Sequence, residues 1–183
     1  MQTKITVYHL EMLSPDQFSP RYAEGMEGLN LREISPPDWH WNRRMYAEVG
    51  KSYHWVNRLS WPAEKWLDYA HRDSLKTVIL EVNQVPAGYF EIERNEFPSV
   101  ELAYFGLVKE FIGRGLGAHL LSVAIEEAWQ DGTERVWVHT CSLDHRHALR
   151  NYQKRGFQVF KTEFEEIEVA ELPVDCLLRE NAG

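Results

Sequence analysis

The chain has 183 residues, of which 44% are hydrophobic and 26% charged, and its formal net charge is −8. This length suits one domain and is too short for two full enzymatic domains, while the composition excludes a globally disordered chain. The acidic balance argues against nucleic acid as a partner, because phosphate binding needs clustered Lys and Arg. No apolar stretch approaches the roughly 20 residues of a membrane span. Two cysteines make no disulfide framework, and the N-terminus lacks a signal-peptide pattern, so a cytoplasmic protein is expected.

In the N-terminal part of the chain apolar and polar residues first alternate, and a helical pattern follows. Period-two patterns predict strands over residues 4–12 and 29–34, and Pro36-Pro37 ends the second strand. Residues 38–69 are typical of helices with a break at Ser60-Trp61-Pro62, where Ser60 is a candidate N-cap. The single domain predicted over 1–183 therefore divides into N-terminal strands (1–35), aromatic-rich helices (36–70) and a core (76–169).

The core begins with three predicted strands, over residues 77–82, 87–94 and 100–108. Their short connections predict an antiparallel meander. A helical apolar face then runs from Gly115 to about Asp131-Gly132, and a strand follows over 135–140. This succession predicts a right-handed crossover, which makes strands 100–108 and 135–140 parallel.

A second helix follows in the core. Asp144 is its candidate N-cap, and Gly156 ends it after Arg155. An acidic strand over 157–169 comes last. The predicted fold class is α+β, a mixed and mostly antiparallel central sheet flanked by helices.

Three glycines alternate in the turn Gly113-Arg114-Gly115-Leu116-Gly117, which precedes the first core helix. Bare backbone N–H groups, the positive end of the helix dipole and the Arg114 cation describe a cradle for a pyrophosphate. A glycine-rich turn without a ligand is the alternative. The Lys-Ser/Thr ending of a nucleoside-triphosphate loop is absent, since Ala118-His119 follow, and a dinucleotide fold would place this loop after the first strand of a parallel sheet.

Strand, glycine turn, helix and strand, followed by a helix that ends in Tyr152-x-x-x-Gly156-Phe157, resemble the GCN5-related N-acetyltransferases (GNAT) over residues 77–160. Gly115 and Gly117 match the end of the family's cofactor loop, while Ile112 stands where Gln or Arg is usual. In the second motif Ala148 and Tyr152 match, and His145 occupies the usual Asn position. The resemblance implies an acyl-CoA N-acyltransferase fold with splayed parallel strands, acetyl-CoA as the acyl donor and an amine acceptor.

The chemistry requires an acid, a base and an oxyanion donor. The resemblance places Tyr152 near the cofactor sulfur, so Tyr152 is the expected acid for the leaving thiolate. Glu101 is the candidate base, and the alternative is that Glu101 is a solvent-exposed carboxylate with a structural role. The backbone N–H of Leu107 is the candidate oxyanion donor. The expected cofactor-binding residues are Phe105, Gly106, Leu107, Val108, Gly113, Arg114, Gly115, Leu116, Gly117, Ala118, His145 and Asn151.

Eight Trp and Tyr residues crowd between Trp39 and Tyr69, and most should pack the helices on the sheet. Because the family's first two helices roof the acceptor pocket, the residues that flank the helix break are the expected acceptor contacts: Tyr53, His54, Trp55 and Trp61. His139, Cys141, His145 and His147 lie close in sequence, but their spacing is poor for zinc, so no metal is expected. The acidic run over 161–180 is typical of a solvated edge strand, with an amine-steering rim as the alternative.

The sequence thus predicts a cytoplasmic, acetyl-CoA-dependent N-acetyltransferase that acts on a primary amine of a small molecule or peptide by direct transfer, without a metal. The departures at Ile112 and His145 motivate a competing class, a non-catalytic acyl-CoA sensor or protein-interaction module on the same fold. The acceptor, the length of the acyl group and the existence of a homodimer stay open.

Overall fold

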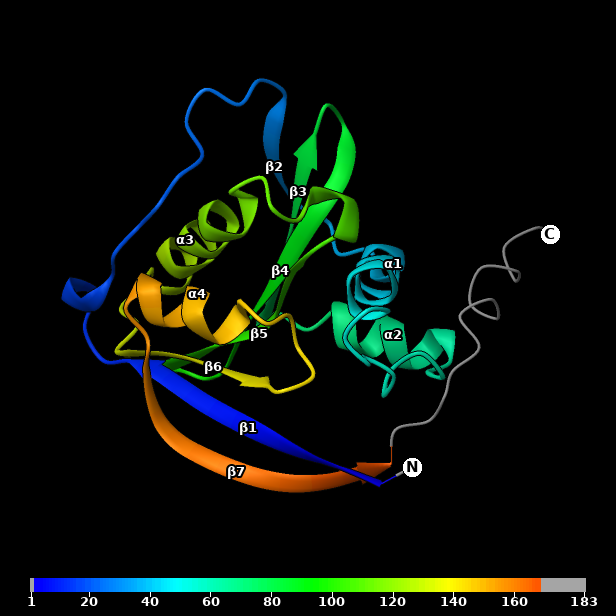
Figure 1. The fold of residues 1–183 in the computed structure, drawn as a ribbon. Coiled ribbons are helices and arrows are strands. Elements are labelled where there is room, and N and C mark those ends of the chain that lie inside the picture. Colours follow the sequence, from blue (N-terminus) through cyan, green and yellow to red (C-terminus); the bar gives the residue numbers. More distant parts are fainter. Residues whose placement is uncertain (1, 169–183) are drawn as a thin grey trace.

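A single seven-stranded sheet organises the protein, in a computed structural model that describes residues 2–168. In spatial order the strands are β2 (Leu29–Glu33), β3 (Leu75–Val82), β4 (Val85–Glu96), β5 (Ser99–Leu107), β6 (Arg135–Cys141), β1 (Gln2–Met12) and β7 (Gln158–Glu168). The helices are α1 (Trp39–Gly50), α2 (Ala63–Ala70), α3 (Leu116–Ala128) and α4 (Ala148–Arg155), with 3-10 turns at Pro15–Gln17 and Lys109–Phe111. All neighbouring strands are antiparallel except β5 and β6, which are parallel, and this confirms the predicted mixed α+β class (Figure 1).

The N-terminal strand β1 lies inside the sheet, between the last two strands of the chain. It pairs antiparallel with β6, where His9 faces His139, and with β7, where Val7 faces Glu163. Figure 1 shows β1 and β7 curving together along one side of the molecule. The acidic strand β7 is therefore an edge strand, as its composition predicted; the acidic residues beyond position 168 lie outside the described residues.

The two faces of the sheet are covered by different helices. Leu80 and Phe90 point to α3, where Leu120 and Leu121 complete the larger core, and all four are fully buried. Their chain neighbours Ile79 and Tyr89 point to α1 and pack with its Met45 and Val49. This alternation follows from the strand repeat of two, and full burial of each such side chain stabilises the fold by roughly 1.5–3 kcal/mol.

Three predicted helix boundaries were wrong. The helix α3 ends at Ala128, because the following Trp129 packs back on the sheet and its Nε1 donates to the Met12 sulfur at 3.4 Å. The helix α4 begins at Ala148 and is not capped by Asp144, whose carboxylate closes the turn after β6 instead. The N-cap position of α2 is occupied by Pro62, without a side-chain cap from Ser60.

Residues 13–28, here called the 13–28 segment, cross the outside of the α3–α4 layer on their way from β1 to β2 (Figure 1). The Ser19 N–H donates to the Arg155 carbonyl at 3.0 Å, and the Arg21 N–H donates to the Ser122 hydroxyl at 2.8 Å. The segment is thus fixed to both helices by its backbone.

Candidate active site

The strands β5 and β6 are parallel, as the crossover predicted, and they separate after a short paired stretch, as the resemblance implied. They pair only where Ser99 to Glu101 face Arg135 to Trp137. Farther along β5, the Val108 N–H donates to the Ala87 carbonyl on β4, at 2.9 Å. Because successive backbone groups of a strand alternate in direction, the Leu107 N–H points the other way, into the gap between β5 and β6.

A cavity of about 1110 Å³ follows this gap. Its walls come from the end of β5, the glycine turn, α4, β6, β1, β7 and residues 51–62 between α1 and α2, called the α1–α2 segment. Thirteen of the predicted site residues line it: Tyr53, His54, Trp55, Phe105, Gly106, Leu107, Gly113, Gly115, Gly117, Ala118, His145, Asn151 and Tyr152. The structure therefore brings most of the predicted site together in one place.

Five predicted site residues do not line the cavity. Val108 and Leu116 are core residues, 9% and 0% exposed, so only their backbone groups can face a ligand. The Arg114 guanidinium lies over the Phe111 ring, 5.1 Å from its centroid. Of the remaining two, Glu101 contacts the lining residue His139, and Trp61 packs on Trp66.

The glycine turn has the conformation that its composition implies. Gly113 and Gly115 have φ angles of +86° and +79°, in the left-handed region that side-chain-bearing residues rarely adopt, and Gly115 is the N-cap of α3. A β-carbon at either position would meet nothing within 4 Å, so the turn faces open space. The Asn151 amide donates to the Gly117 carbonyl at 3.1 Å and joins α4 to the turn. The first N–H groups of α3 are therefore free to bind an anion.

Basic side chains gather at the α4 end of the cavity, despite the net negative charge of the chain. Arg21, Arg150, Lys154 and Arg155 all line it. Within residues 2–168, none of these four side chains makes an ion pair with a carboxylate. This end of the cavity has an uncompensated positive charge, which favours a polyanionic ligand.

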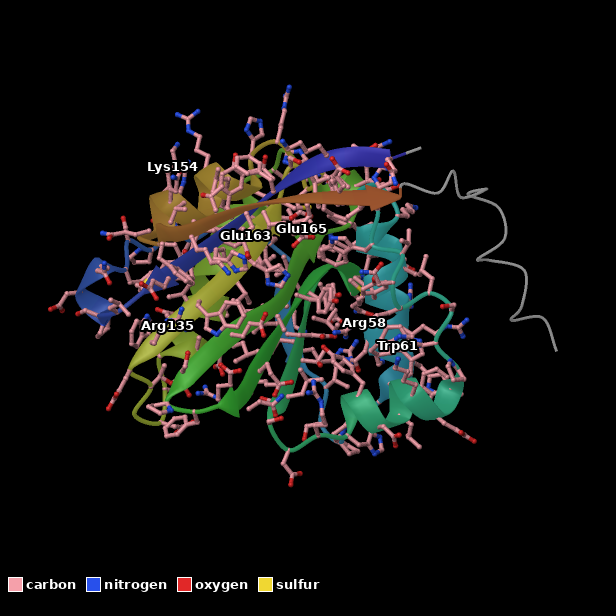
Figure 2. All side chains as sticks on the ribbon, turned by 90° about the horizontal axis from the view of Figure 1, so that it is seen from below. Arg58, Trp61, Arg135, Lys154, Glu163 and Glu165 are labelled. Carbon is pink, nitrogen blue, oxygen red and sulfur yellow. The ribbon has the colours of Figure 1, made fainter. Side chains whose placement is uncertain are left out.

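The opposite end of the cavity is anionic and carries histidines. Figure 2 shows Glu163 and Glu165 on β7, with Lys154 of α4 on one side of them and Arg58 and Trp61 on the other. Glu165 lines the cavity, and the Glu163 Oε2 lies 2.7 Å from the His9 Nε2.

Glu101 contacts the cavity indirectly, through His139. Its Oε1 lies 3.4 Å from the His139 Nδ1, and His139 lines the cavity where Glu101 does not. A hydrogen bond to Glu101 raises the pKa of His139 above the ordinary imidazole value, and burial opposes the shift. The His139 and His9 rings face each other across β6 and β1, with centroids 6.1 Å apart. Of the Glu101 and His139 side chains, only His139 lines the cavity.

Tyr152 is 5% exposed and lies between two aromatic rings. It packs edge-on against Phe105 and Phe157, with centroids 6.0 and 5.9 Å away. Burial raises the pKa of its phenol above the ordinary value. The phenol therefore stays protonated, and the same desolvation would raise the pKa of a thiolate formed beside it.

Trp55 and Trp61, both predicted as acceptor contacts, have different surroundings. Trp55 lines the cavity, packs edge-on against Tyr104 at 5.1 Å and donates from Nε1 to Asp144 at 3.3 Å. Trp61 packs on Trp66 at 5.2 Å and contacts the Arg58 guanidinium at 4.6 Å. The position of Trp61 is that of a packing residue.

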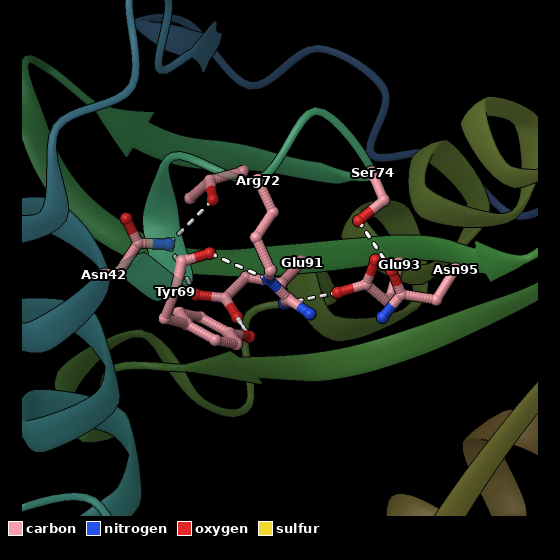
Figure 3. Close-up of polar contacts among 8 residues, drawn as sticks. Asn42, Tyr69, Arg72, Ser74, Glu91, Glu93 and Asn95 are labelled. Carbon is pink, nitrogen blue, oxygen red and sulfur yellow. Dashed lines mark hydrogen bonds and ion pairs between the residues drawn. The ribbon is translucent and has the colours of Figure 1, made fainter. Parts of the chain in front are cut away.

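A polar network anchors the two helices that carry this wall (Figure 3). The buried Glu91 on β4 accepts hydrogen bonds from the Tyr69 hydroxyl of α2 and from the Asn42 amide of α1, the latter at 2.7 Å. Beside it Arg72 pairs with Glu93, which is 7% exposed. Burial raises the pKa of Glu91, while both hydrogen bonds oppose that shift.

Sequence reasoning missed several lining residues, including His9 on β1, Arg21 on the 13–28 segment and Tyr104 on β5. Tyr104 was accessible to prediction, since it adjoins Phe105. His9 and Arg21 come from parts of the chain whose place in the fold no local pattern shows.

No set of three or more His, Cys, Asp or Glu side chains within residues 2–168 is arranged to hold a metal ion. In the same range no helix has the length and apolar character to cross a membrane.

The profile of the Acetyltransferase (GNAT) family matches residues 32–157, more than half of the chain. The chain therefore belongs to the GNAT family of acetyltransferases. No curated protein matches it.

Solved structures share the fold at low sequence identity. A GCN5-related N-acetyltransferase from Kribbella flavida is 17% identical with a TM-score of 0.61, over 90% of this chain and 58% of that protein. A second GCN5-related N-acetyltransferase, from Sphaerobacter thermophilus, is 16% identical with a TM-score of 0.64, over 88% of this chain and 51% of that protein. An aminoglycoside acetyltransferase from an uncultured soil metagenomic sample, in complex with sisomicin, is 12% identical with a TM-score of 0.58, over 70% and 87%. The chain spans a little more than half the length of the first two proteins.

Proposed function

We propose that this protein transfers an acetyl group from acetyl-CoA to a primary amine of a small molecule or peptide, in one direct step. The observation that carries the proposal is the polarity of a single cavity. Arg21, Lys154 and the glycine turn lie at one end, while Glu165 and the His139–Glu101 pair lie at the other. An anionic coenzyme and a cationic amine fit these two ends and meet at the gap between β5 and β6.

The cofactor would enter along the open edge of β5. The N–H groups of the glycine turn would bind its pyrophosphate, and the unpaired edge at Phe105 and Leu107 would hydrogen-bond the pantetheine amides. The Leu107 N–H points into the gap, so it is the proposed donor to the oxyanion of the tetrahedral intermediate.

The proposed base is His139, assisted by Glu101. His139 takes a proton from the ammonium group of the acceptor, because it lines the cavity; Glu101 fixes the ring and stabilises the imidazolium. The neutral amine nitrogen then attacks the thioester carbon and forms a tetrahedral intermediate whose nitrogen carries one proton too many. When this intermediate collapses, the carbon–sulfur bond breaks, Tyr152 donates its proton to the leaving sulfur, and the nitrogen releases its extra proton, which restores the Tyr152 phenol. The sequence suggested Glu101 as the direct base, and the geometry favours the relayed role.

The acceptor class follows from the anionic end of the cavity. Asp144 and Glu165 would hold one or more ammonium groups, and Trp55 and Tyr104 offer flat apolar surface beside them. One structural neighbour is an aminoglycoside acetyltransferase with sisomicin bound, which supports including aminoglycosides in a panel of candidate amines. The cytoplasmic location stays a prediction, and the existence of a homodimer stays open.

The test combines calorimetry with acetyl-CoA and a free-thiol release assay over an amine panel. The Tyr152→Phe variant should release thiol about 100-fold more slowly or worse, with an unchanged Kd for acetyl-CoA, because only proton donation is lost. Tyr22 lies on the 13–28 segment outside the cavity, and its hydroxyl donates to Glu126 on α3. Tyr22→Phe is therefore the matched control and should behave like the wild type. An unchanged rate in Tyr152→Phe would contradict the acid assignment. Binding without thiol release on any amine would instead support the sensor class.

A further inference from the structure

The α4 end of the cavity contains a buried arginine that forms no ion pair within residues 2–168. Arg155 is 7% exposed, and its buried Nε has no hydrogen-bond partner among the described residues. A buried N–H donor without a partner is costly unless a ligand supplies the missing acceptor. Its side chain nevertheless lines the cavity, so a ligand can reach it.

A second arginine, Arg21, lies near Arg155. The backbone of the 13–28 segment is tied to α4 by the Ser19–Arg155 hydrogen bond and to α3 by the Arg21–Ser122 hydrogen bond. This brings the Arg21 guanidinium to the same cavity. Burial lowers the pKa of Arg155, and the charge of Arg21 lowers it further. Lys154 lies next to Arg155 in sequence, and within residues 2–168 no carboxylate forms an ion pair with any of the three side chains. Three like charges without a counter-ion favour the binding of a multiply charged anion.

This cationic cluster lies next to the glycine turn without being part of it. Asn151 contacts Gly117 directly, and Arg155 follows Asn151 by four residues of α4, about 6 Å along its axis. On α3, the Ser122 that fixes Arg21 lies a little more than one turn after Gly117. An anion bound by the arginines would therefore be a short, fixed distance from a pyrophosphate bound at the turn.

We propose that Arg21, Lys154 and Arg155 form a separate subsite for the ribose 3′-phosphate of coenzyme A. The inference rests on the proposed function, in which the glycine turn holds the pyrophosphate of the same molecule. Ribose separates these two phosphate groups, as the turn and the cluster are separated in the groove between α3 and α4. Arginine suits the role because its planar donors match phosphate oxygens. The subsite discriminates coenzyme A from its 3′-dephospho form.

The experiment measures Kd by calorimetry for coenzyme A and for 3′-dephospho-coenzyme A. The wild type should bind coenzyme A about tenfold more tightly or better, as expected for charge-assisted contacts. The Arg21→Gln variant should lose most of that preference by weakening coenzyme A alone. Arg21 is exposed, so this substitution should leave folding intact. Arg44→Gln, on α1 and outside the cavity, is the charge-matched control and should change neither Kd.

Arg155→Gln should abolish the preference, and a thermal melt shows whether this buried change is tolerated; if it unfolds the protein, Arg21→Gln decides. Equal affinity of the wild type for both ligands would overturn the subsite. Equal weakening of both ligands by Arg21→Gln would also overturn it, since the arginine would then bind the pyrophosphate. Binding of neither ligand to the wild type would instead refute the proposed function.

Discussion

At Gly106 the strand β5 comes into close contact with the helix α1. A β-carbon added there would overlap the Cγ1 methyl of Val49 on α1. The next contacts are ordinary, at 3.8 Å to the Val49 Cβ and 3.9 Å to the Trp55 ring. The Gly106→Ala substitution therefore creates one clash, with one methyl group, at a buried contact between β5 and α1.

The cost should be that of a locally overpacked core, about 1–3 kcal/mol. For a chain of this length each kcal/mol lowers Tm by roughly 2–4 °C, so we expect a fall of about 2–12 °C. Val49 is 2% exposed, and Val49→Ala alone should cost about 1–3 kcal/mol through lost burial. In the double variant the clash is absent, so the destabilisation should fall below the sum of the single changes by about 1 kcal/mol or more.

Thermal and urea unfolding of the four proteins in this cycle measure the coupling. The Kd for acetyl-CoA provides a second readout, because Gly106 lies on the strand that is proposed to hold the pantetheine arm. Strictly additive effects would refute the reasoning, since the cost of Gly106→Ala would then not come from Val49. A wild-type Tm for Gly106→Ala would also refute it, since β5 and α1 would then separate without cost.

Two further substitutions test the anionic end of the cavity. Glu101→Gln should lower the pKa of His139 and move the acid limb of the kcat/KM profile to lower pH, because neutral imidazole then persists under more acidic conditions; loss of activity at every pH would identify Glu101 itself as the base. Asp144→Ala removes the acceptor of three hydrogen bonds, from Thr140, Cys141 and Trp55, and should lower the free energy of unfolding by about 1–3 kcal/mol in a urea titration. An unchanged urea midpoint for this variant would show that the turn after β6 holds without its carboxylate.

Local patterns predicted those parts of the site that depend on neighbouring residues. Alternating glycines before an apolar helical face were sufficient to locate the turn, because both left-handed backbone positions must be glycine. The parallel arrangement of β5 and β6 followed from the crossover rule.

Long-range pairing decided the remaining features. The alternation over residues 4–12 identifies a strand and does not identify its partners, so the contribution of His9 to the cavity was hidden. Arg21 belongs to a segment without periodicity, placed by contacts with two helices about a hundred residues later. Asp144 was a plausible cap by sequence position, and the nearer N–H of Cys141 captured its carboxylate.

The insertion of β1 between β6 and β7 has a consequence for how the protein matures on the ribosome. The strand β1 is synthesised before both of the strands that pair with it, so His9 stays unpaired until His139 has emerged. A chaperone that shields this early, edge-exposed strand would protect the nascent chain from aggregation. The part of the cavity wall that β1, β6 and β7 form can therefore close only after β7 has been synthesised.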